Sequence, residues 1–482
     1  MSPLTSTLAL LAIPLLALAA APRRDALTVI MLALVAFLAL VIDRYTQRYL
    51  DGQSAAPRYR QWFVATVAAA ALLVSTQDLR VLALAWTASS LSLHQLLAFF
   101  ADRPQAQVAA HKKFLLSRLA DVVIYAAVYL LGRDAGSYDL AAIAGWATTT
   151  AALPTSVHVA GALLVAGVAL RSAQLPFHGW LIQVMEAPTP VSALLHAGIV
   201  NIGGFVLIRL APLIARLPDI QIALVTIGAI TAVLAAIVTS TRISVKVALA
   251  WSTAAQMGFM LVECGLGAWE LALLHLVAHS CYKAHAFLNS GSVVAAHTQG
   301  TFAVPTSPAT LGRWIVGALL GSGLAVLALS LVDGAQIAPV SRWFAAGTLA
   351  MALAPLFVAA AGASRAHTAW RLLLLPLAVA LMVAAEHAVL TRLPLASVVM
   401  PLNPPALAIV LVAFGALFAV QVTIAVRPFG TVARTLHPLA FAGFHLDALF
   451  TRATFLLWPP RVIARGRMTS PTTAALTARS TH

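Results

Sequence analysis

The sequence predicts an all-α polytopic membrane protein, and three observations support this fold class. Hydrophobic residues make up 61% of the 482 residues, only 9% of the residues are charged, and apolar stretches recur along the whole length. A soluble domain carries about 25% charged residues, whereas a helix that crosses a bilayer needs roughly 17 to 25 mainly apolar residues. The stretches also lack the strict alternation of polar and apolar residues that marks the strands of a membrane β-barrel.

The apolar stretches divide the chain into about 13 to 15 expected spanning helices with short connections. They occupy residues 4–21, 25–42, 61–76, 79–101, 114–132, 156–174, 187–214, 219–240, 245–266, 269–293, 309–332, 342–362, 370–391 and 404–426, with a further short span at 139–152. The first stretch is expected to be retained, because its basic pair, Arg23-Arg24, follows the apolar residues instead of preceding them as in a cleaved signal.

Three segments differ in composition. Residues 1–433 are expected to form one transmembrane domain, because no long polar connection interrupts them. Residues 434–467 mix arginines with aromatic and aliphatic residues, a composition typical of an amphipathic, basic segment at the membrane interface. Residues 468–482 are rich in Thr, Ser and Ala and are expected to be a disordered tail.

The net charge of +15 does not require nucleic acid as a partner. Basic residues gather in the connections at 43–60 and 102–113 and again near the C-terminus. By the positive-inside rule these connections lie on the cytoplasmic side, beside anionic lipid; docking of an acidic partner at the same face remains an alternative. The two cysteines, Cys264 and Cys281, cannot make a disulfide framework or a four-thiolate metal site, so no metal is expected on this chain.

Two consecutive helices are predicted to be broken. The helix that starts near Ser156 runs into Pro176, and the next helix opens at Pro188-Thr189-Pro190. Proline removes a backbone donor and clashes with the preceding turn. Loosened backbone is tolerated in hydrocarbon only where protein or an internal water path surrounds it. Paired interruptions of this kind are typical of transport sites, although a single proline can also be tolerated in a membrane helix.

A first polar cluster lies at the first interruption. Arg171, Gln174 and His178 follow the spacing i, i+3, i+7 and share one helical face unless Pro176 twists them apart. A charge at mid-bilayer costs at least about 2.5–3.5 kcal/mol, so Arg171 needs an anion or water. Glu186 is the nearest acidic residue in the sequence and is the expected partner; snorkelling of Arg171 to the interface is the alternative.

A second and a third cluster follow in later helices. Ser192, His196 and Asn201 lie in the second broken helix, where imidazole can pass a proton from one side to the other, although a His among apolar residues is often only a core residue. His275, His279 and Lys283 then recur at i, i+4, i+8. Two His residues at i, i+4 could bind a metal, but no acidic or Cys ligand shares that face. Since a buried Lys readily loses its proton, a His-His-Lys relay is favoured over a metal site.

The helix at 245–266 connects these clusters. Lys246 and Glu263 lie near its opposite ends, where a charge at the interface is the alternative interpretation. Ser252, Gln256 and Glu263 follow the spacing i, i+4, i+11 and are expected to share one face. A polar axis therefore connects six titratable residues: Arg171, His196, Lys246, His275, His279 and Lys283.

These motifs resemble the antiporter-like proton-pumping membrane subunits of respiratory complex I (NADH-quinone oxidoreductase), over roughly residues 80–300. The resemblance rests on Arg171-Ser172-Ala173-Gln174-Leu175-Pro176, on Ala187-Pro188-Thr189-Pro190-Val191-Ser192, on Leu249-Ala250-Trp251-Ser252 and on His275-Leu276-Val277-Ala278-His279 with Lys283. It implies two inverted five-helix repeats, each with a broken helix, around a hydrated axis that conducts protons. In that pattern Arg171 stands where the family usually has Lys. Lys246, His275, His279 and Lys283 match the family's relay, and His196 matches its broken-helix His.

The sequence also departs from that family. Thr87 follows Trp86 where the family carries a functional Glu, and no convincing intramembrane Lys occurs between 309 and 391. A narrower resemblance covers the run from Arg171 to Arg209, with Phe177-His178-Gly179-Trp180 and Asn201-Ile202-Gly203-Gly204-Phe205. This run is similar to the DabB family, the membrane subunits of a two-component inorganic carbon pump.

The narrower resemblance implies a transporter subunit of the bacterial inner membrane that is not itself an enzyme. It would supply a cation path, for H⁺ in preference to Na⁺, to a DabA-like zinc protein at the cytoplasmic face that resembles β-carbonic anhydrases. The alternatives are a proton-translocating subunit of an NADH-quinone oxidoreductase or of a multi-subunit cation/proton antiporter, and a membrane anchor whose polar axis is a relic.

Overall fold

The structure is a computed structural model that describes residues 2–22, 24–100, 103–292, 309–330, 339–362, 366–390, 398 and 400–459. Within these ranges the regular elements are helices, which confirms the predicted all-α class. The first half contains α1 (Pro3–Ala20), α2 (Ala26–Tyr49), α3 (Ala56–Ser75), α4 (Leu79–Leu97), α5 (Pro104–Ala135), α6 (Leu140–Thr149), α7 (Thr155–Arg171), α8 (Gly179–Gln183), η1 (Val184–Glu186), α9 (Thr189–Ala197), η2 (Ile199–Asn201), α10 (Ile202–Arg209) and α11 (Ala211–Ile214).

The second half continues with longer helices. These are α12 (Pro218–Thr239), α13 (Val245–Gly265), α14 (Trp269–Leu288), α16 (Leu311–Ser330), α17 (Pro339–Ala361), α18 (Ala366–Leu390), α19 (Pro404–Val426), α20 (Thr431–Phe441), η3 (Gly443–His445) and α21 (Ala448–Leu457). Most of them fall on the predicted apolar stretches, because a run of about 20 apolar residues is stable in a bilayer only when its backbone is hydrogen-bonded within the helix.

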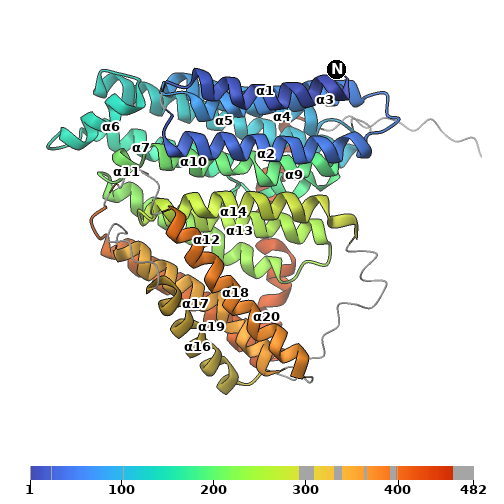
Figure 1. Ribbon diagram of the computed structural model, residues 1–482, viewed down its shortest axis with the longest axis vertical. Helices are drawn as coiled ribbons and strands as arrows, with labels where there is room; N and C mark the ends of the chain where they lie inside the picture. Colours follow the sequence, from blue (N-terminus) through green and yellow to red (C-terminus); the bar gives the residue numbers. More distant parts are fainter. Residues whose placement is uncertain are drawn as a thin grey trace, which may run out of the picture.

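The helices form two groups (Figure 1). In the first group α1 to α5, α7, α9 and α10 lie nearly parallel to one another and to α12, α13 and α14. In the second group α16, α17, α18 and α19 are inclined to the first, and α19 packs against α12. The broken elements α8 to α10 contact α5, α7, α13 and α14, so they lie inside the first group and not at its rim.

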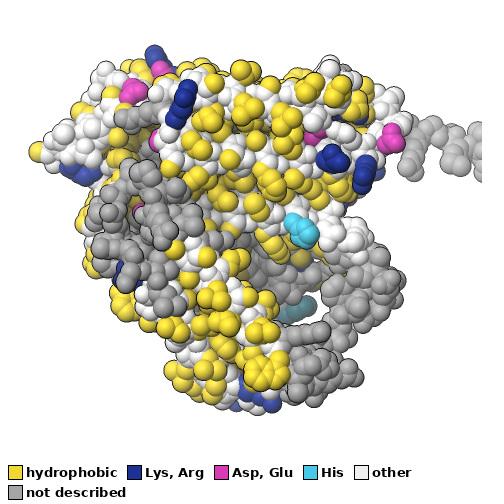
Figure 2. Space-filling view, viewed as in Figure 1, with side chains coloured by type: hydrophobic (Ala, Val, Ile, Leu, Met, Phe, Trp, Pro, Cys, Tyr) yellow, Lys and Arg dark blue, Asp and Glu magenta, His cyan; other side chains and the backbone are white. Residues whose placement is uncertain are grey.

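The protein is a multi-pass membrane protein. Among the described residues, nine helices are long and apolar enough to cross a membrane, including α2, the broken segment Thr189–Arg209 and α12. Figure 2 shows the expected surface: hydrophobic side chains cover the flank of the first group, and charged side chains gather near the ends of its helices. An apolar belt between charged ends is the surface that a bilayer requires.

The placement of one basic cluster by the sequence is wrong. Lys112 and Lys113 were expected in a charged cytoplasmic connection, yet α5 begins at Pro104 and both side chains are buried, at 1% and 4% exposed. The helix starts early because Pro104 occupies its first turn, where a missing N–H is tolerated. Both lysines therefore lie inside the bundle.

The C-terminal basic segment folds as two short helices. α20 and α21 are joined by a sharp turn in which Gly443, Phe444 and His445 have positive φ angles. The hairpin α20–α21 does not lie free at the interface, because α21 packs on α5 and α20 contacts α12. Residues 460–467 of the predicted interfacial segment, and the predicted tail at 468–482, lie outside the described residues.

Candidate functional site

The chain is interrupted where the prolines predict it. α7 ends at Arg171, residues 172–178 are not helical, and the path resumes through α8 and η1 before α9 begins at Thr189. Because the helix stops at Arg171, the helical spacing of Arg171, Gln174 and His178 no longer applies, and the expected common face is not formed. The three side chains are all buried inside the first helix group.

Arg171 pairs with Asp121 of α5, and the expected pairing with Glu186 is wrong. The guanidinium contacts the Asp121 carboxylate, donates to the backbone oxygen of Trp86 at 2.9 Å, and lies 4.7 Å above the Trp86 ring. Glu186 is instead half exposed and lies 3.7 Å from the equally exposed Arg103. Glu186 ends a 3₁₀ turn and is exposed, whereas Arg171 is buried, so proximity in sequence does not produce contact.

Asp121 is the centre of a buried charge cluster between α4, α5 and α7. It accepts from Arg118 at 2.9 Å and from the Thr87 hydroxyl at 2.8 Å, in addition to Arg171. Thr87 thus contacts a carboxylate on the neighbouring helix. Each guanidinium is attracted by the shared carboxylate, and the contacts of Asp121 with Arg171 and Thr87 connect α5 to α7 and α4.

Lys113 lies beside this cluster without a carboxylate of its own. Its Nζ donates to the backbone oxygen of Ser90 at 2.6 Å and to the Ser90 hydroxyl at 2.7 Å. Arg118 also reaches the Ser90 hydroxyl, at 3.4 Å, so Ser90 connects Lys113 to the Asp121 cluster. The sequence analysis missed Asp121 and Lys113 as site residues.

The second row of polar residues follows α9, α13 and α14. Lys246 donates to the Thr189 hydroxyl at 2.9 Å and is within electrostatic range of Glu186. Further along, the Nδ1 of His196 lies 3.1 Å from the Thr253 hydroxyl, and the imidazole stacks on Phe287 at 4.4 Å.

The row continues along α14. Lys283 is 1% exposed, contacts the Ser252 hydroxyl and donates to the backbone oxygen of Leu249 at 3.1 Å. His279 lies 5.8 Å from His275, measured between ring centroids, and within the described residues neither of its ring nitrogens has a hydrogen-bond partner. Because a neutral imidazole has both a donor and an acceptor, His279 can accept a proton on one side and release another on the opposite side.

The row ends at an ion-pairing contact. The Nδ1 of His275 lies 2.8 Å from the Glu263 carboxylate, and both side chains are mostly buried. Among the described residues no group of three or more His, Cys, Asp or Glu side chains could hold a metal ion.

The remaining predicted residues lie at varied places. Gln174 donates to the Ser172 backbone oxygen at 3.1 Å, and Ser192 is fully buried. Asn201, which was grouped with Ser192 and His196, donates to the Ser280 hydroxyl of α14 at 2.8 Å. Gln256 lies in α13 with Ser252 and Glu263 and is exposed, whereas Glu263 is buried.

Polar cavities lie at both ends of the first helix group. One, of about 450 Å³, lies beside the broken helix, where α5 and α13 begin; its lining includes His178, Gln183 and Asp447. The other, of about 270 Å³, lies where α2, α4 and α14 begin and α13 ends; its lining includes Asp25 and Glu270. Since α13 runs from the first end to the second, the two cavities are on opposite sides of the bundle.

The second cavity carries a structural ion pair. Asp25 caps α2 and accepts from Arg209 at 2.6 Å. Burial raises the pKa of Asp25, but the coulombic attraction of Arg209 and hydrogen bonds from Thr28 and Arg209 outweigh it and hold the pKa below its ordinary value. Asp25 therefore stays charged and anchors α2 to α10 at this end.

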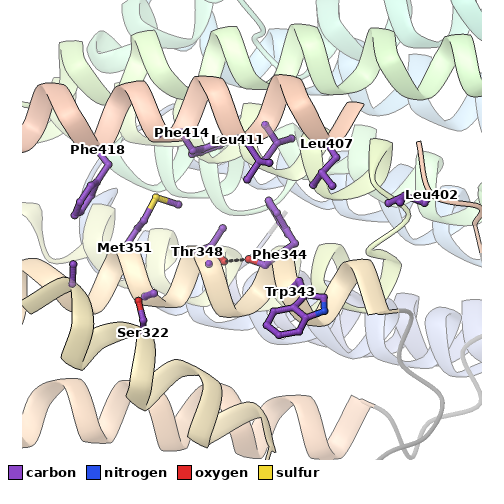
Figure 3. A pocket seen from close by; sticks show the side chains of 15 residues that line it. Ser322, Trp343, Phe344, Thr348, Met351, Leu402, Leu407, Leu411, Phe414 and Phe418 are labelled. Carbon is purple, nitrogen blue, oxygen red and sulfur yellow. Dashed lines mark hydrogen bonds between the residues drawn. The ribbon is translucent and has the colours of Figure 1, made fainter. Parts of the chain in front are cut away.

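A further cavity is not part of this polar row. It measures about 700 Å³ and lies between α16, α17 and α19, with Trp343, Phe344 and Phe414 in its lining (Figure 3). The Thr348 hydroxyl is already bonded to the Phe344 backbone oxygen at 2.9 Å. None of its lining residues is titratable, so the cavity suits apolar contacts and not a charge.

Comparisons with known proteins point to one family. The family model described as NADH:quinone oxidoreductase/Mrp antiporter, TM, matches residues 76–307. A protein of Hydrogenovibrio crunogenus named "Probable inorganic carbon transporter subunit DabB" is 45% identical over 318 residues, which cover 66% of this chain and 61% of that protein. A protein of Halothiobacillus neapolitanus named "Probable inorganic carbon transporter subunit DabB2" is 36% identical over 449 residues, which cover 91% of this chain and 80% of that protein.

A solved structure shares the fold. The structure of the Mrp complex from a Dietzia species contains a chain that matches with a TM-score of 0.56 and 24% identity, covering 94% of this chain and 54% of that chain. The chain thus spans about half of this structural relative and 61% and 80% of the two sequence relatives. Both the family match and the fold place the polar row in the membrane domain of an antiporter-like protein.

Proposed function

The chain belongs to the DabB family of antiporter-like membrane subunits, and from that premise we propose that it conducts a cation, H⁺, to power inorganic carbon uptake. The observation that carries the proposal is the buried row Lys246, His196, Lys283, His279 and His275, each side chain set in or against α9, α13 and α14. Buried ionisable groups are costly in a membrane and mark ion pathways by default.

The residues of the row have distinct roles in this proposal. Lys246, His279 and Lys283 carry protons, and His275 extends the path to Glu263. His196 connects the row to the broken helix. There the guanidinium of Arg171 supplies a permanent positive charge and orders water. Gln174, His178 and Ser192 supply polar surroundings near the interruption. Glu186 acts on Lys246 and not, as the sequence indicated, on Arg171.

The carbon chemistry is assigned to a partner. The names of the relatives describe them as subunits of inorganic carbon transporters. We propose that a DabA-like zinc protein resembling carbonic anhydrases docks at the cytoplasmic face of this chain in the bacterial inner membrane. On this proposal zinc is bound by the partner and this chain holds no cofactor.

Growth in air tests the proposal. The chain is expressed with and without the partner in a bacterial host that lacks carbonic anhydrase. Restored growth and accumulation of labelled inorganic carbon are expected only when both chains are present. Growth that stays absent with both chains assembled in the membrane would contradict the proposal.

A second function has specific support. The family model includes subunits of NADH:quinone oxidoreductase and of Mrp antiporters, and the fold resembles a chain of an Mrp complex. This chain would then translocate protons within such an assembly. Purification in mild detergent separates the two: co-purifying flavin and iron–sulfur subunits, or sodium-dependent proton exchange in vesicles, would favour the second function over the first.

A further inference from the structure

The carboxylate of Asp447 contacts three elements beside the cavity at the broken helix. We call this end of the bundle the mouth of the polar row. Both of its oxygens accept from the Nζ of Lys112 on α5, at 2.7 and 2.8 Å. It also accepts from the Gln183 amide of α8 at 3.0 Å and from the Thr451 hydroxyl of α21 at 3.0 Å. Lys112 is 1% exposed, so this is a largely desolvated ion pair that holds the start of α21 against the broken helix.

The backbone of the broken helix is shaped for this contact. Gly179 is the first residue of α8, and a Cβ atom at that position would overlap the Asp447 carboxylate. A glycine is thus required for α21 to approach so closely. Residues 172–178, where the helix is interrupted, and Gly179, against which Asp447 packs, are consecutive in the chain and form one surface.

Aromatic side chains also hold the rest of the hairpin α20–α21 against the bundle. Trp458 stacks on His111 of α5 with ring centroids 3.9 Å apart, and Phe450 packs edge-on to Phe177 at 4.9 Å. At the other end, Arg242 donates to the backbone oxygens of Ala440 and Phe441, at 2.7 and 2.6 Å. The hairpin is therefore fastened to both sides of the broken helix.

The hairpin covers a titratable residue of the mouth. His178 lines the 450 Å³ cavity together with Asp447, Thr451 and Arg452 of the C-terminal segment, yet it is only 1% exposed. On the proposed function, a cation would enter the row at this end past His178 and Gln183, which line the cavity with residues of the hairpin. Residues of the hairpin therefore form one wall of this cavity, beside His178.

We propose that the hairpin α20–α21 is a latch: the ion pair between Lys112 and Asp447 keeps the mouth at the broken helix closed, and its release admits the cation. The inference rests on the proposed cation conduction and adds a regulatory element to it. The hairpin is suited to this role because one ion pair, a few hydrogen bonds and a few aromatic contacts join it to the bundle. Breaking such a pair shifts the closed state on the order of a hundredfold toward release.

A reversible cross-link tests the latch in the full chain with its partner. Cys281, which is exposed, is first replaced by Ser, and Gln183→Cys is then combined with Asp447→Cys and treated with a short bifunctional methanethiosulfonate, whose disulfide bridge a reductant cleaves. The native Gln183 and Asp447 side chains are in hydrogen-bond contact at 3.0 Å, so a short bridge can span the two positions. Thiol alkylation should show that the bridge forms in membranes. The bridged protein should lose partner-dependent uptake, and reduction should restore conduction.

A second variant tests release without the cross-link. Asp447→Asn should raise passive cation conductance in vesicles without the partner, whereas the matched control Asp51→Asn, in an exposed loop position, should not. Failure of the bridge to form, uptake by the locked protein at the rate of the Cys281→Ser parent, or unchanged conductance in assembled Asp447→Asn protein would each overturn the latch. A parent that conducts no cation at all would instead refute the proposed function.

Discussion

At the scale of single residues, lysine is confined to buried or half-buried positions, whereas arginine also occupies exposed positions. The sequence contains lysine at four positions only, and all four lie in helices of the first group: Lys112, Lys113, Lys246 and Lys283. Three of them are at most 4% exposed, and the fourth is half-buried. Burial readily removes the proton of Lys but not that of Arg. The chain therefore has Lys at buried positions, where a proton can be released, and leaves its exposed cationic positions to Arg.

Replacing Lys283 by Met should abolish partner-dependent carbon uptake. The apolar side chain fills a similar volume, so assembly should persist while the proton carrier between Ser252 and His279 is lost. Lys283→Arg should fail as well, because a guanidinium does not release its proton at this site. Uptake of labelled inorganic carbon, normalised to chain in the membrane, measures both variants; activity in either one would remove Lys283 from the path.

Asp121→Asn should destabilise the protein strongly. The change leaves the buried charge of Arg171 without its carboxylate, and breaking a buried pair in this way costs about 3–5 kcal/mol. Thermal unfolding of the detergent-solubilised chain measures the loss. Asp51→Asn, at an exposed position, is the control and should unfold close to the parent. An Asp121→Asn protein as stable as the parent would show that Arg171 is neutralised by other groups.

At the scale of helices, the sequence predicted most elements but not their polar contacts. Apolar runs and prolines predicted the helix positions and the interruption at Pro176, because bilayer thickness and a missing N–H are local constraints. The contact of Arg171 with Asp121 joins residues 50 positions apart. It depends on α5 packing against α7, which hydropathy does not reveal. Lys113 was likewise assigned to a loop because the charge rule considers composition and not burial.

The close packing of α12 on α13 yields a prediction at this scale. A Cβ at Gly228 would lie 2.5 Å from the backbone oxygen of Gly258, and one at Gly258 would lie 2.6 Å from that of Gly228. Gly258→Ala should therefore force the helices apart and cost about 1–3 kcal/mol. The shift α13 undergoes would also move Ser252 away from Lys283.

The matched control for this change is Gly323→Ala in α16. A Cβ there meets no atom within 4 Å, so the substitution should be neutral or slightly stabilising. Thermal unfolding in the same detergent compares the two variants. Equal unfolding temperatures would mean that the α12–α13 contact can relax without loss.

At the scale of the whole molecule, the proposed function requires an energy source, and the side chains of the row indicate which ion would supply it. One charge that crosses about 150 mV releases about 3.5 kcal/mol, which can sustain a gradient of roughly 300-fold. The row consists of Lys and His side chains with hydroxyl neighbours, and a proton moves along such groups by transfer between them. Na⁺ instead needs several oxygen ligands in one place, and the described part of the row offers mainly nitrogen donors and single hydroxyls.

A protonophore should therefore collapse carbon accumulation in cells that contain the chain and its partner, whereas withdrawal of sodium from the medium should leave it largely intact. Accumulation of labelled inorganic carbon is measured at a fixed external pH, with a host lacking the chain as the control for passive entry. Accumulation that survives the protonophore and fails when sodium is withdrawn would contradict a proton path. It would place the conducted ion on oxygen ligands, and the imidazoles of His275 and His279 would then be structural.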